Sequence, residues 1–429
     1  MNVICQKLIK LVLFLNILFF NACSVNTSII NTFEQKYDFD RVDHIRVATW
    51  FEEEKPLNEV IDSFHERFPH VQVELVLYPS QSYDQYIDEI IDDEKGIDVI
   101  LFPSLMNYAS LTFENHLLNL KEWLDEDEVD LSVFGTLLNS INTEDDLYGL
   151  PYRNSVFLLY YNKTLFDQAG IDYPSKDMTW DMFYSKAKAL TRGEGNDKIW
   201  GTFLQSYVQL WTIQSLQNGY NFLDDDLSSF EKSLQFSLNL VENDLMLKPA
   251  EIDSRDLIQN GSIKFFGNGK VAMMPMGEWT AWQLIANEEI DFEWAVTKMP
   301  YPMGGRRDVS IGNMSIASVL NHSQSKEMAF EFIKSLSGPS GAKIYASAGS
   351  IPAIVNEETR EIYLKNTNPN LSLHFFLETQ TESISPYHQK SAEIVNLFKD
   401  TFEDVLDQKL SIDEAMDFIY QERLRIFKD

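Results

Sequence analysis

The chain contains almost no cysteine. Only Cys5 and Cys23 occur among 429 residues, and both lie near the N-terminus. The sequence after Cys23 can therefore form neither a disulfide nor a thiolate. This excludes a disulfide scaffold, a cysteine nucleophile and a thiolate metal site from the main part of the protein.

Positive charge is also scarce. The sequence has 35 lysines and arginines against 66 aspartates and glutamates, which gives a formal net charge of −31. Such an acidic chain repels polyanions, so we predict no nucleic-acid partner and no electrostatic binding to anionic lipid headgroups. Solubility is a simpler explanation of the acidity than attraction to a cationic partner.

Sequence motifs of catalysis are missing as well. There is no nucleophile elbow, no phosphate-binding loop and no histidine spacing typical of metal ligands, and the seven histidines are scattered. We therefore predict no catalytic residue, no metal site and no cofactor. A secreted glycoside hydrolase is the enzymatic alternative, because 66 acidic residues can always supply a carboxylate pair, but abundance alone is a weak signal.

The N-terminus carries the signals of export. Lys7 and Lys10 precede an apolar run over residues 11–20, which is too short for a membrane span but suits a secretion signal. Residues 21–24 resemble a bacterial lipobox with Cys23 as the lipidated residue. Phe20 and Asn21 depart from that pattern, so ordinary secretion with cleavage nearby is the alternative. We predict a signal peptide over 1–22 and a lipidated N-terminus with a polar tether over 23–43.

The roughly 390 residues that follow favour two lobes over one. Strand patterns at 45–48, 71–77 and 96–102 alternate with helix patterns that begin near residue 56 and at 83–91. This order predicts a parallel sheet with right-handed crossovers, in which ligands bind at the carboxyl ends of the strands. Trp50 and Ser104 fall at two such ends. Trp50 is equally well explained as a core aromatic, and Ser104 as part of a plain turn.

Residues 145–183 are typical of a chain that crosses between two lobes. Gly149 and Pro151 form a turn, residues 155–161 a buried strand, and residues 164–169 a helix that ends at Gly170. A second helix begins after Thr179, its predicted N-cap. Tyr152, Arg153 and Asn154 begin the crossing and are candidate ligand contacts.

Residues 265–282 form the second informative segment, with a turn at Gly267 and Gly269, a strand over 271–274, and a helix that opens around Glu278. Together with 149–152, 160–166, 169–170 and 179–183, this segment resembles the extracellular solute-binding proteins of ABC importers, in the sugar-binding branch that includes the maltose-binding protein. The resemblance implies two doubly wound α/β lobes, joined by three hinge crossings with a ligand cleft between them, as in type II periplasmic binding proteins. Residues 310–318 and 347–353 resemble the other two crossings. The implied lobes are 44–153 plus 310–349 and 154–309 plus 350–429.

The same resemblance suggests a ligand site. Trp279 would stack on a sugar ring while Trp282 packs inside, or the two could exchange roles. Trp211 would face the sugar, although an aromatic in a helix is more often in the core. Glu278 would bind hydroxyls or cap the helix that follows it. Flat aromatics suit the C–H face of a sugar and polar groups suit its edge. The complete candidate set is Trp50, Ser104, Tyr152, Arg153, Asn154, Trp211, Glu278, Trp279, Gly312 and Asn313.

The function implied is that of a monomeric extracytoplasmic lipoprotein that captures a carbohydrate, with an oligosaccharide favoured, and delivers it to the permease of an ABC transporter. Its contact with the membrane would be the lipid anchor. Capture of this kind needs no bond breaking, so we predict that the protein is not an enzyme. A lipid-anchored sensor or adhesin that binds sugar without transport is the main alternative.

Overall fold

The computed structural model describes residues 43–141, 146–255, 257, 261–365, 367–383 and 385–428. The predictions of a signal peptide, of lipidation at Cys23 and of a tether concern residues 1–43. Apart from Asp43, they lie outside the described residues.

The first strands form the predicted parallel sheet. β1 (Asp43–Trp50) lies between β2 (Val71–Tyr78) and β3 (Val99–Phe102), and both pairs are parallel. Helix α3 (Glu54–Arg67) follows β1 and buries Leu57, Val60, Ile61 and Phe64 on one face, because these apolar residues recur at helical spacing. α5 (Leu105–Phe113) follows β3.

The helix predicted over 83–91 is shorter than expected. Residues Ser80–Tyr86 form a 3-10 segment, and only one turn of α-helix, α4 (Ile87–Ile90), follows it. Tyr83 and Tyr86 both pack on Tyr78 at the end of β2, with ring centroids 6.0 and 4.9 Å from that ring. These contacts hold the segment against the end of β2, so it does not form the full helix that its apolar spacing predicts.

One long strand connects the two halves of the molecule. β4 (Leu150–Asn162) pairs over its first half with β8 (Val309–Val319), and over its second half with β6 (Val271–Gly277) and β7 (Trp294–Thr297), always antiparallel. β8 also pairs with β3, and β6 with β5 (Trp200–Thr202). The resulting strand order is β2-β1-β3-β8-β4-β6-β5. The sequence predicted only residues 155–161 of this strand, because Gly149 and Pro151 indicated a turn; the structure instead extends the strand back to Leu150.

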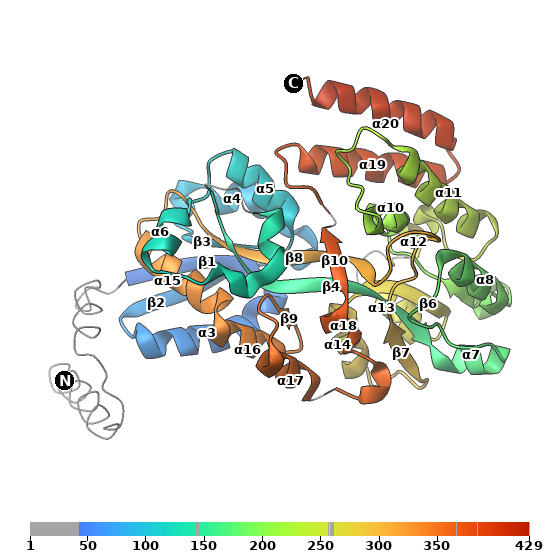
Figure 1. Cartoon of the computed structure of the whole chain (residues 1–429), viewed down its shortest axis with the longest axis horizontal. Coiled ribbons are helices and arrows are strands. Elements are labelled where there is room, and N and C mark those ends of the chain that lie inside the picture. Colours follow the sequence, from blue (N-terminus) through green and yellow to red (C-terminus); the bar gives the residue numbers. More distant parts are fainter. Residues whose placement is uncertain are drawn as a thin grey trace.

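The buried side chains group around two bodies. One cluster draws on residues 45–152 and 314–354, and its body is termed the first lobe. Two further clusters draw mainly on residues 156–311 and 363–419, and their body is termed the second lobe. In Figure 1 the first lobe lies at the left and the second at the right, with β4 and β8 running through the middle. The fold is the mixed α/β, two-lobed architecture that the sequence predicted.

Two short strands complete the junction between the lobes. β9 (Ile351–Pro352) pairs with Arg153 and Asn154 of β4. It is the third extended segment at the junction, beside β4 and β8. β10 (Gln380–Ser383) pairs with β8 and had no clear sequence signal. Gly312 is enclosed by this pairing, since a β-carbon built on it would lie 2.6 Å from the Ser155 carbonyl oxygen and 2.6 Å from Thr381.

Helices cover both lobes. Several begin and end where the sequence indicated: the Thr179 hydroxyl caps α8, Gly170 ends α7 with φ 68°, and Ser411 and Glu414 form a capping box on α20. The single helix predicted over 209–219 is instead two short helices that meet at Thr212. The second-lobe helices before β7 are α7 (Lys163–Ala169), α8 (Trp180–Leu190), α9 (Val208–Trp211), α10 (Ile213–Gln217), α11 (Ser228–Glu242), α12 (Pro249–Ser254), α13 (Gly261–Gly267) and α14 (Trp279–Ala286).

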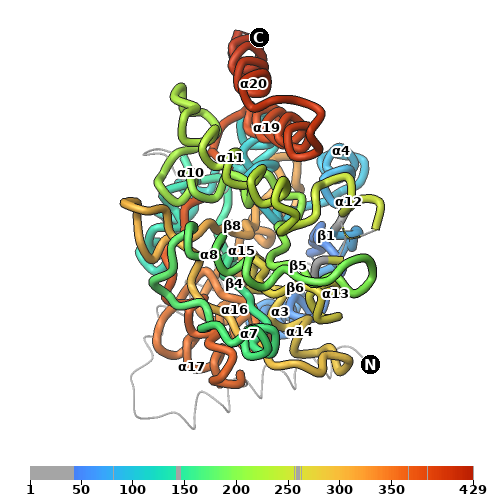
Figure 2. Tube along the Cα trace, turned by 90° about the vertical axis from the view of Figure 1, so that its right-hand side faces the viewer, coloured from blue at the N-terminus to red at the C-terminus, as the bar shows by residue number. Residues whose placement is uncertain are grey.

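In the first lobe, α6 (Lys121–Glu126) follows α5, and the other α-helices follow β8. They are α15 (Lys326–Ser337), α16 (Pro339–Ser347), α17 (Glu357–Lys365), α18 (Phe375–Glu378), α19 (Ser391–Leu406) and α20 (Ile412–Ile426). Figure 2 shows α19 and α20 at one end of the molecule and α17 at the other, with β4 and β8 between them. Of the helices in the described part of the chain, none combines the length and the hydropathy that a bilayer crossing requires.

Candidate functional site

A buried ion pair lies at the junction of the lobes. Arg153 on β4 donates from Nη1 to Oε1 of Glu53 at 2.6 Å, and the Tyr345 hydroxyl on α16 donates to Oε2 of Glu53 at 2.6 Å. The guanidinium carbon lies 5.8 Å from the centre of the Trp50 ring. Burial lowers the pKa of Arg153, but the carboxylate of Glu53, together with Tyr152, Glu278 and Tyr345, raises it above its ordinary value, so the guanidinium stays charged.

Glu53 is a site residue that the sequence did not single out. It lies in the charged run 52–55, which reads as a solvated rim, yet only 1% of its surface is exposed. The short 3-10 turn over Phe51–Glu53 after β1 turns this carboxylate inward while Glu52 remains exposed. Its position at the carboxyl end of a central parallel strand is the signal that could have identified it.

Glu278 forms a second polar contact with β4. Its carboxylate accepts hydrogen bonds from the Ser155 hydroxyl and the Val156 backbone N–H, both at 3.3 Å. No side-chain bond from Glu278 caps α14, so of its two predicted roles helix capping is absent. Burial raises the pKa of Glu278 to about 7. The charge of nearby Arg153 and the hydrogen bonds that the Glu278 carboxylate accepts lower this pKa, but by less than burial raises it. The carboxyl group therefore titrates near neutral pH.

The two tryptophans of α14 occupy different environments. Trp279 is half-buried, meets Phe157 edge to face at 5.4 Å, and covers Gly277, where an added β-carbon would lie 1.9 Å from the indole. Trp282 instead packs on Gly349 beside the third crossing, where the corresponding distance is 2.3 Å. This placement favours Trp279 as the aromatic for a ligand and Trp282 as the packing residue.

Three polar candidates lie where β3, β4 and β8 meet. Asn313 donates from Nδ2 to the carbonyl of Pro103 at 3.2 Å, which places it beside Ser104 at the start of α5. In the register of β4 and β8, Asn313 faces Ser155, the neighbour of Asn154. Ser104, Asn154 and Asn313 are all half-buried. The structure therefore places these three residues on neighbouring segments, at the end of β3, on β4 and on β8.

The remaining candidates are more deeply buried. Tyr152 is 1% exposed and packs edge to face on Tyr345 behind the ion pair, and Trp50 is 5% exposed and packs on Tyr83. Gly312 is enclosed between strands. Trp211 lies apart from the others in the core of the second lobe, which favours its packing alternative.

The assembled groups are suited to binding. They offer an aromatic plane, amides, hydroxyls, a guanidinium and a carboxyl group that titrates near pH 7, which together can contact both the face and the edge of a polar ring. Within the described residues, no group of three or more histidine, cysteine or acidic side chains could hold a metal ion.

Comparison with known proteins decides the family. Residues 48–343 match the family model of the bacterial extracellular solute-binding proteins. The chain belongs to this family. Among curated relatives, this solute-binding protein is 24% identical over 294 residues to an arabinooligosaccharide-binding protein of Halalkalibacterium halodurans, covering 64% of this chain and 62% of the relative. It is 21% identical over 322 residues to a multiple sugar-binding protein of Streptococcus mutans, covering 70% and 72%. The chain spans less than two thirds of the length of several of these relatives.

Solved structures show the same fold. An ABC substrate-binding protein from Listeria monocytogenes in complex with cycloalternan superimposes with a TM-score of 0.77 at 22% identity, covering 89% of this chain and 97% of that one. A sugar transporter from Rhizobium etli in an open conformation gives a TM-score of 0.75 at 24% identity, covering 88% and 98%. At these identities the likeness establishes the architecture of the solute-binding protein and leaves its ligand to be inferred from the site.

Proposed function

We propose that this solute-binding protein captures a carbohydrate, an oligosaccharide in preference to a single sugar, between its two lobes and delivers it to an ABC transporter permease. The observation that carries the proposal is the half-buried indole of Trp279, which directly follows Glu278, whose carboxyl group bonds to Ser155 and Val156 just after Arg153 and Asn154 on β4. A sugar needs both a flat apolar partner and polar groups around its edge. The relatives named for binding arabinooligosaccharides and multiple sugars support the same ligand class.

Capture works through closure of the lobes. The proposed first lobe comprises 44–153 plus 310–349 and the second 154–309 plus 350–429, with β4, β8 and the segment around β9 as hinges. The separate core clusters on either side of these strands support this division. A ligand that contacts both lobes stabilises the closed arrangement and so shifts the population toward it.

The proposed location of the protein follows from its N-terminus. Cleavage after residue 22 and lipidation at Cys23 would hold a monomer at the outer face of the bacterial membrane, with 24–43 as its tether. The sequence around Cys23 and the extracellular assignment of the family support this proposal.

A thermal-shift screen of the mature protein against a carbohydrate panel tests the ligand class. A ligand that binds only the folded state at 100 times its Kd stabilises the protein by about 2.7 kcal/mol, so a cognate oligosaccharide raises the melting temperature by several degrees. Calorimetry on each hit, with analysis of the products after incubation, separates binding from hydrolysis. Stabilisation by amino acids or peptides and by no carbohydrate would contradict the proposal. Uptake of the hit by vesicles that hold the permease separates transport from sensing.

A further inference from the structure

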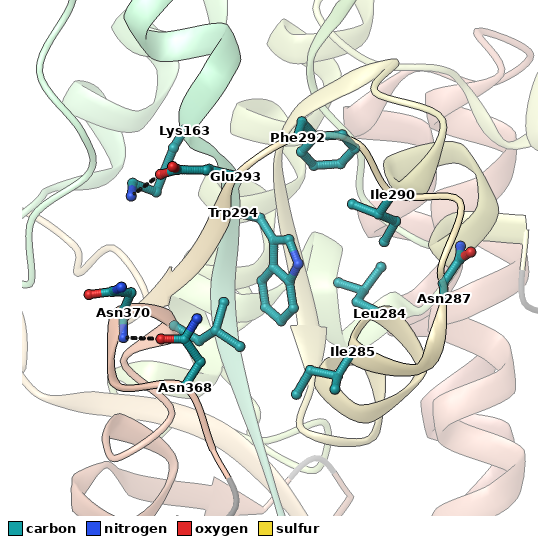
Figure 3. Close-up of a pocket in the computed structure, with 11 residues that line it drawn as sticks. Lys163, Leu284, Ile285, Asn287, Ile290, Phe292, Glu293, Trp294, Asn368 and Asn370 are labelled. Atoms are coloured by element: carbon teal, nitrogen blue, oxygen red, sulfur yellow. Dashed lines mark hydrogen bonds and ion pairs between the residues drawn. The ribbon is translucent and has the colours of Figure 1, made fainter.

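A cavity of about 470 Å³ lies at the outer end of the second lobe, lined by the end of α14, the segment before β7, Lys163 and the short turn Pro369–Leu371. Figure 3 shows its side chains. β4 carries the chain from Arg153 to this end in nine residues, which at about 3.3 Å per residue places the cavity roughly 30 Å from the ion pair at the junction. The volume falls within the roughly 300–1,000 Å³ range of small-molecule sites.

Trp294 stands at the centre of the cavity (Figure 3). It is 8% exposed, and its ring stacks on Tyr160 with centroids 5.9 Å apart. Its indole Nε1–H donates to no described residue, and in Figure 3 this nitrogen points to the side formed by Leu284 and Ile290. The ring is nearly buried, while its N–H faces the cavity. Such a group needs a hydrogen-bond partner, which water or a ligand supplies.

The remaining lining combines apolar walls with amides. Leu284, Ile285, Ile290, Phe292 and Leu371 provide C–H surface. Asn287, Asn368 and Asn370 add carboxamide groups, and their Nδ2 atoms donate to no described residue. At the rim, Lys163 and Glu293 neutralise each other through a 2.6 Å ion pair. The cavity therefore offers apolar surface, several hydrogen-bonding groups and no free charge.

We propose that this cavity is a second carbohydrate site, separate from the junction of the lobes and sized for one or two sugar units. The C–H face of the sugar packs on the aliphatic wall, and its hydroxyls accept from the Trp294 indole and bond to the amides. An apolar molecule would leave the indole N–H without a partner, and an anion would find Lys163 already paired with Glu293 and would meet the net charge of −31. Because the lining comes from the second lobe alone, the site binds in both the open and the closed arrangement.

Indole N–H signals of the mature chain labelled with nitrogen-15 test this site, with maltose, lactose and mannobiose as probes. The eight tryptophans give a small set of signals. The Trp294 signal is the one lost in Trp294→Phe, or is assigned by triple-resonance spectra if that variant does not fold. At least one probe is expected to shift the Trp294 signal saturably. Asn370→Ala is expected to weaken that binding about fivefold, the scale of one hydrogen bond. The control Asn58→Ala, an exposed asparagine on α3, leaves it unchanged.

Three results would overturn the proposal. The first is the absence of a saturable Trp294 shift with all three probes at their highest soluble concentrations. The second is a shift produced by cyclohexanol and by none of the sugars, which would make the cavity an apolar site. The third is loss of the shift in Trp279→Ala, which would show that it is relayed from the junction. Persistence of the shift in that variant supports the second site, even if the proposed site between the lobes fails its own test.

Discussion

Replacing Arg153 by methionine removes the guanidinium that pairs with Glu53 and leaves the apolar stem in place. Glu53 is 1% exposed and would keep the hydrogen bond from Tyr345 but lose its charged partner. Breaking a buried ion pair from one side typically costs about 3–5 kcal/mol, because the remaining charge is neither solvated nor neutralised. The Arg153 side chain is 19% exposed, so some water can reach the vacated space. We therefore expect a loss near the lower limit, about 3 kcal/mol of unfolding free energy.

Urea unfolding followed by tryptophan fluorescence measures this loss in four proteins: wild type, Arg153→Met, Glu53→Gln and the double variant. Glutamine keeps an acceptor for Tyr345 but carries no charge, so the double variant leaves no buried charge. It should recover most of the stability lost in Arg153→Met. The coupling energy between the two substitutions is then expected to be about 2 kcal/mol.

A different outcome would refute the reasoning. If Arg153→Met and the double variant lose the same stability, with a coupling energy below about 0.5 kcal/mol, Glu53 gains nothing from the guanidinium. The pair would then be a surface-like contact of little energetic weight.

Three further predictions concern the ligand, pH and the anchor. Trp279→Ala should weaken carbohydrate binding by about 1–3 kcal/mol in calorimetry and leave the fold intact, whereas Trp282→Ala should lower stability; unchanged affinity in Trp279→Ala would argue against stacking. Burial raises the pKa of Glu278 from 4.5 to about 7, so the folded state binds this proton more tightly than the unfolded chain. The unfolding free energy should therefore fall as the pH rises from about 4.5 to 7, by up to about 3 kcal/mol relative to Glu278→Gln. Parallel pH profiles of the two proteins would contradict this. Cys23→Ser should release the protein from membranes, and a variant that stays bound and carries lipid label would show that the anchor lies elsewhere.

Local signals predicted much of the secondary structure. The cap at Thr179, the glycine after α7 and the capping box at Ser411 work through contacts within four residues, so the sequence displays them directly. The 3-10 segment around Tyr83 depends on packing against Trp50 of β1, and at the break the Thr212 hydroxyl bonds back to the Val208 carbonyl. Helical periodicity alone therefore predicted longer helices than the structure contains.

The sequence could likewise predict some residues of the candidate site and not others. Arg153, Glu278 and Trp279 lie in segments whose turns and strand ends are visible in the sequence, and the structure brings these segments together on β4 and β6. The sequence could not distinguish Glu53 from Glu52, because neighbouring carboxylates look alike until the turn after β1 points one inward. Nor could it place Trp211, since an aromatic in a short helix fits a core and a binding surface equally well.

The sequence by itself determined the acidic, cysteine-poor composition, the α/β pattern and the crossing segments, because each depends on composition or on short-range periodicity; export and lipidation stay predictions. Only the tertiary structure decided which charges are buried together, what Trp279 and Trp282 pack against and where a cavity forms around Trp294. These properties arise where elements far apart in the chain become neighbours, as β4 and α16 do where Arg153 and Tyr345, 192 residues apart, both bond to Glu53. No local pattern records such a meeting, since burial and pairing depend on the side chains that the rest of the fold brings to the same place.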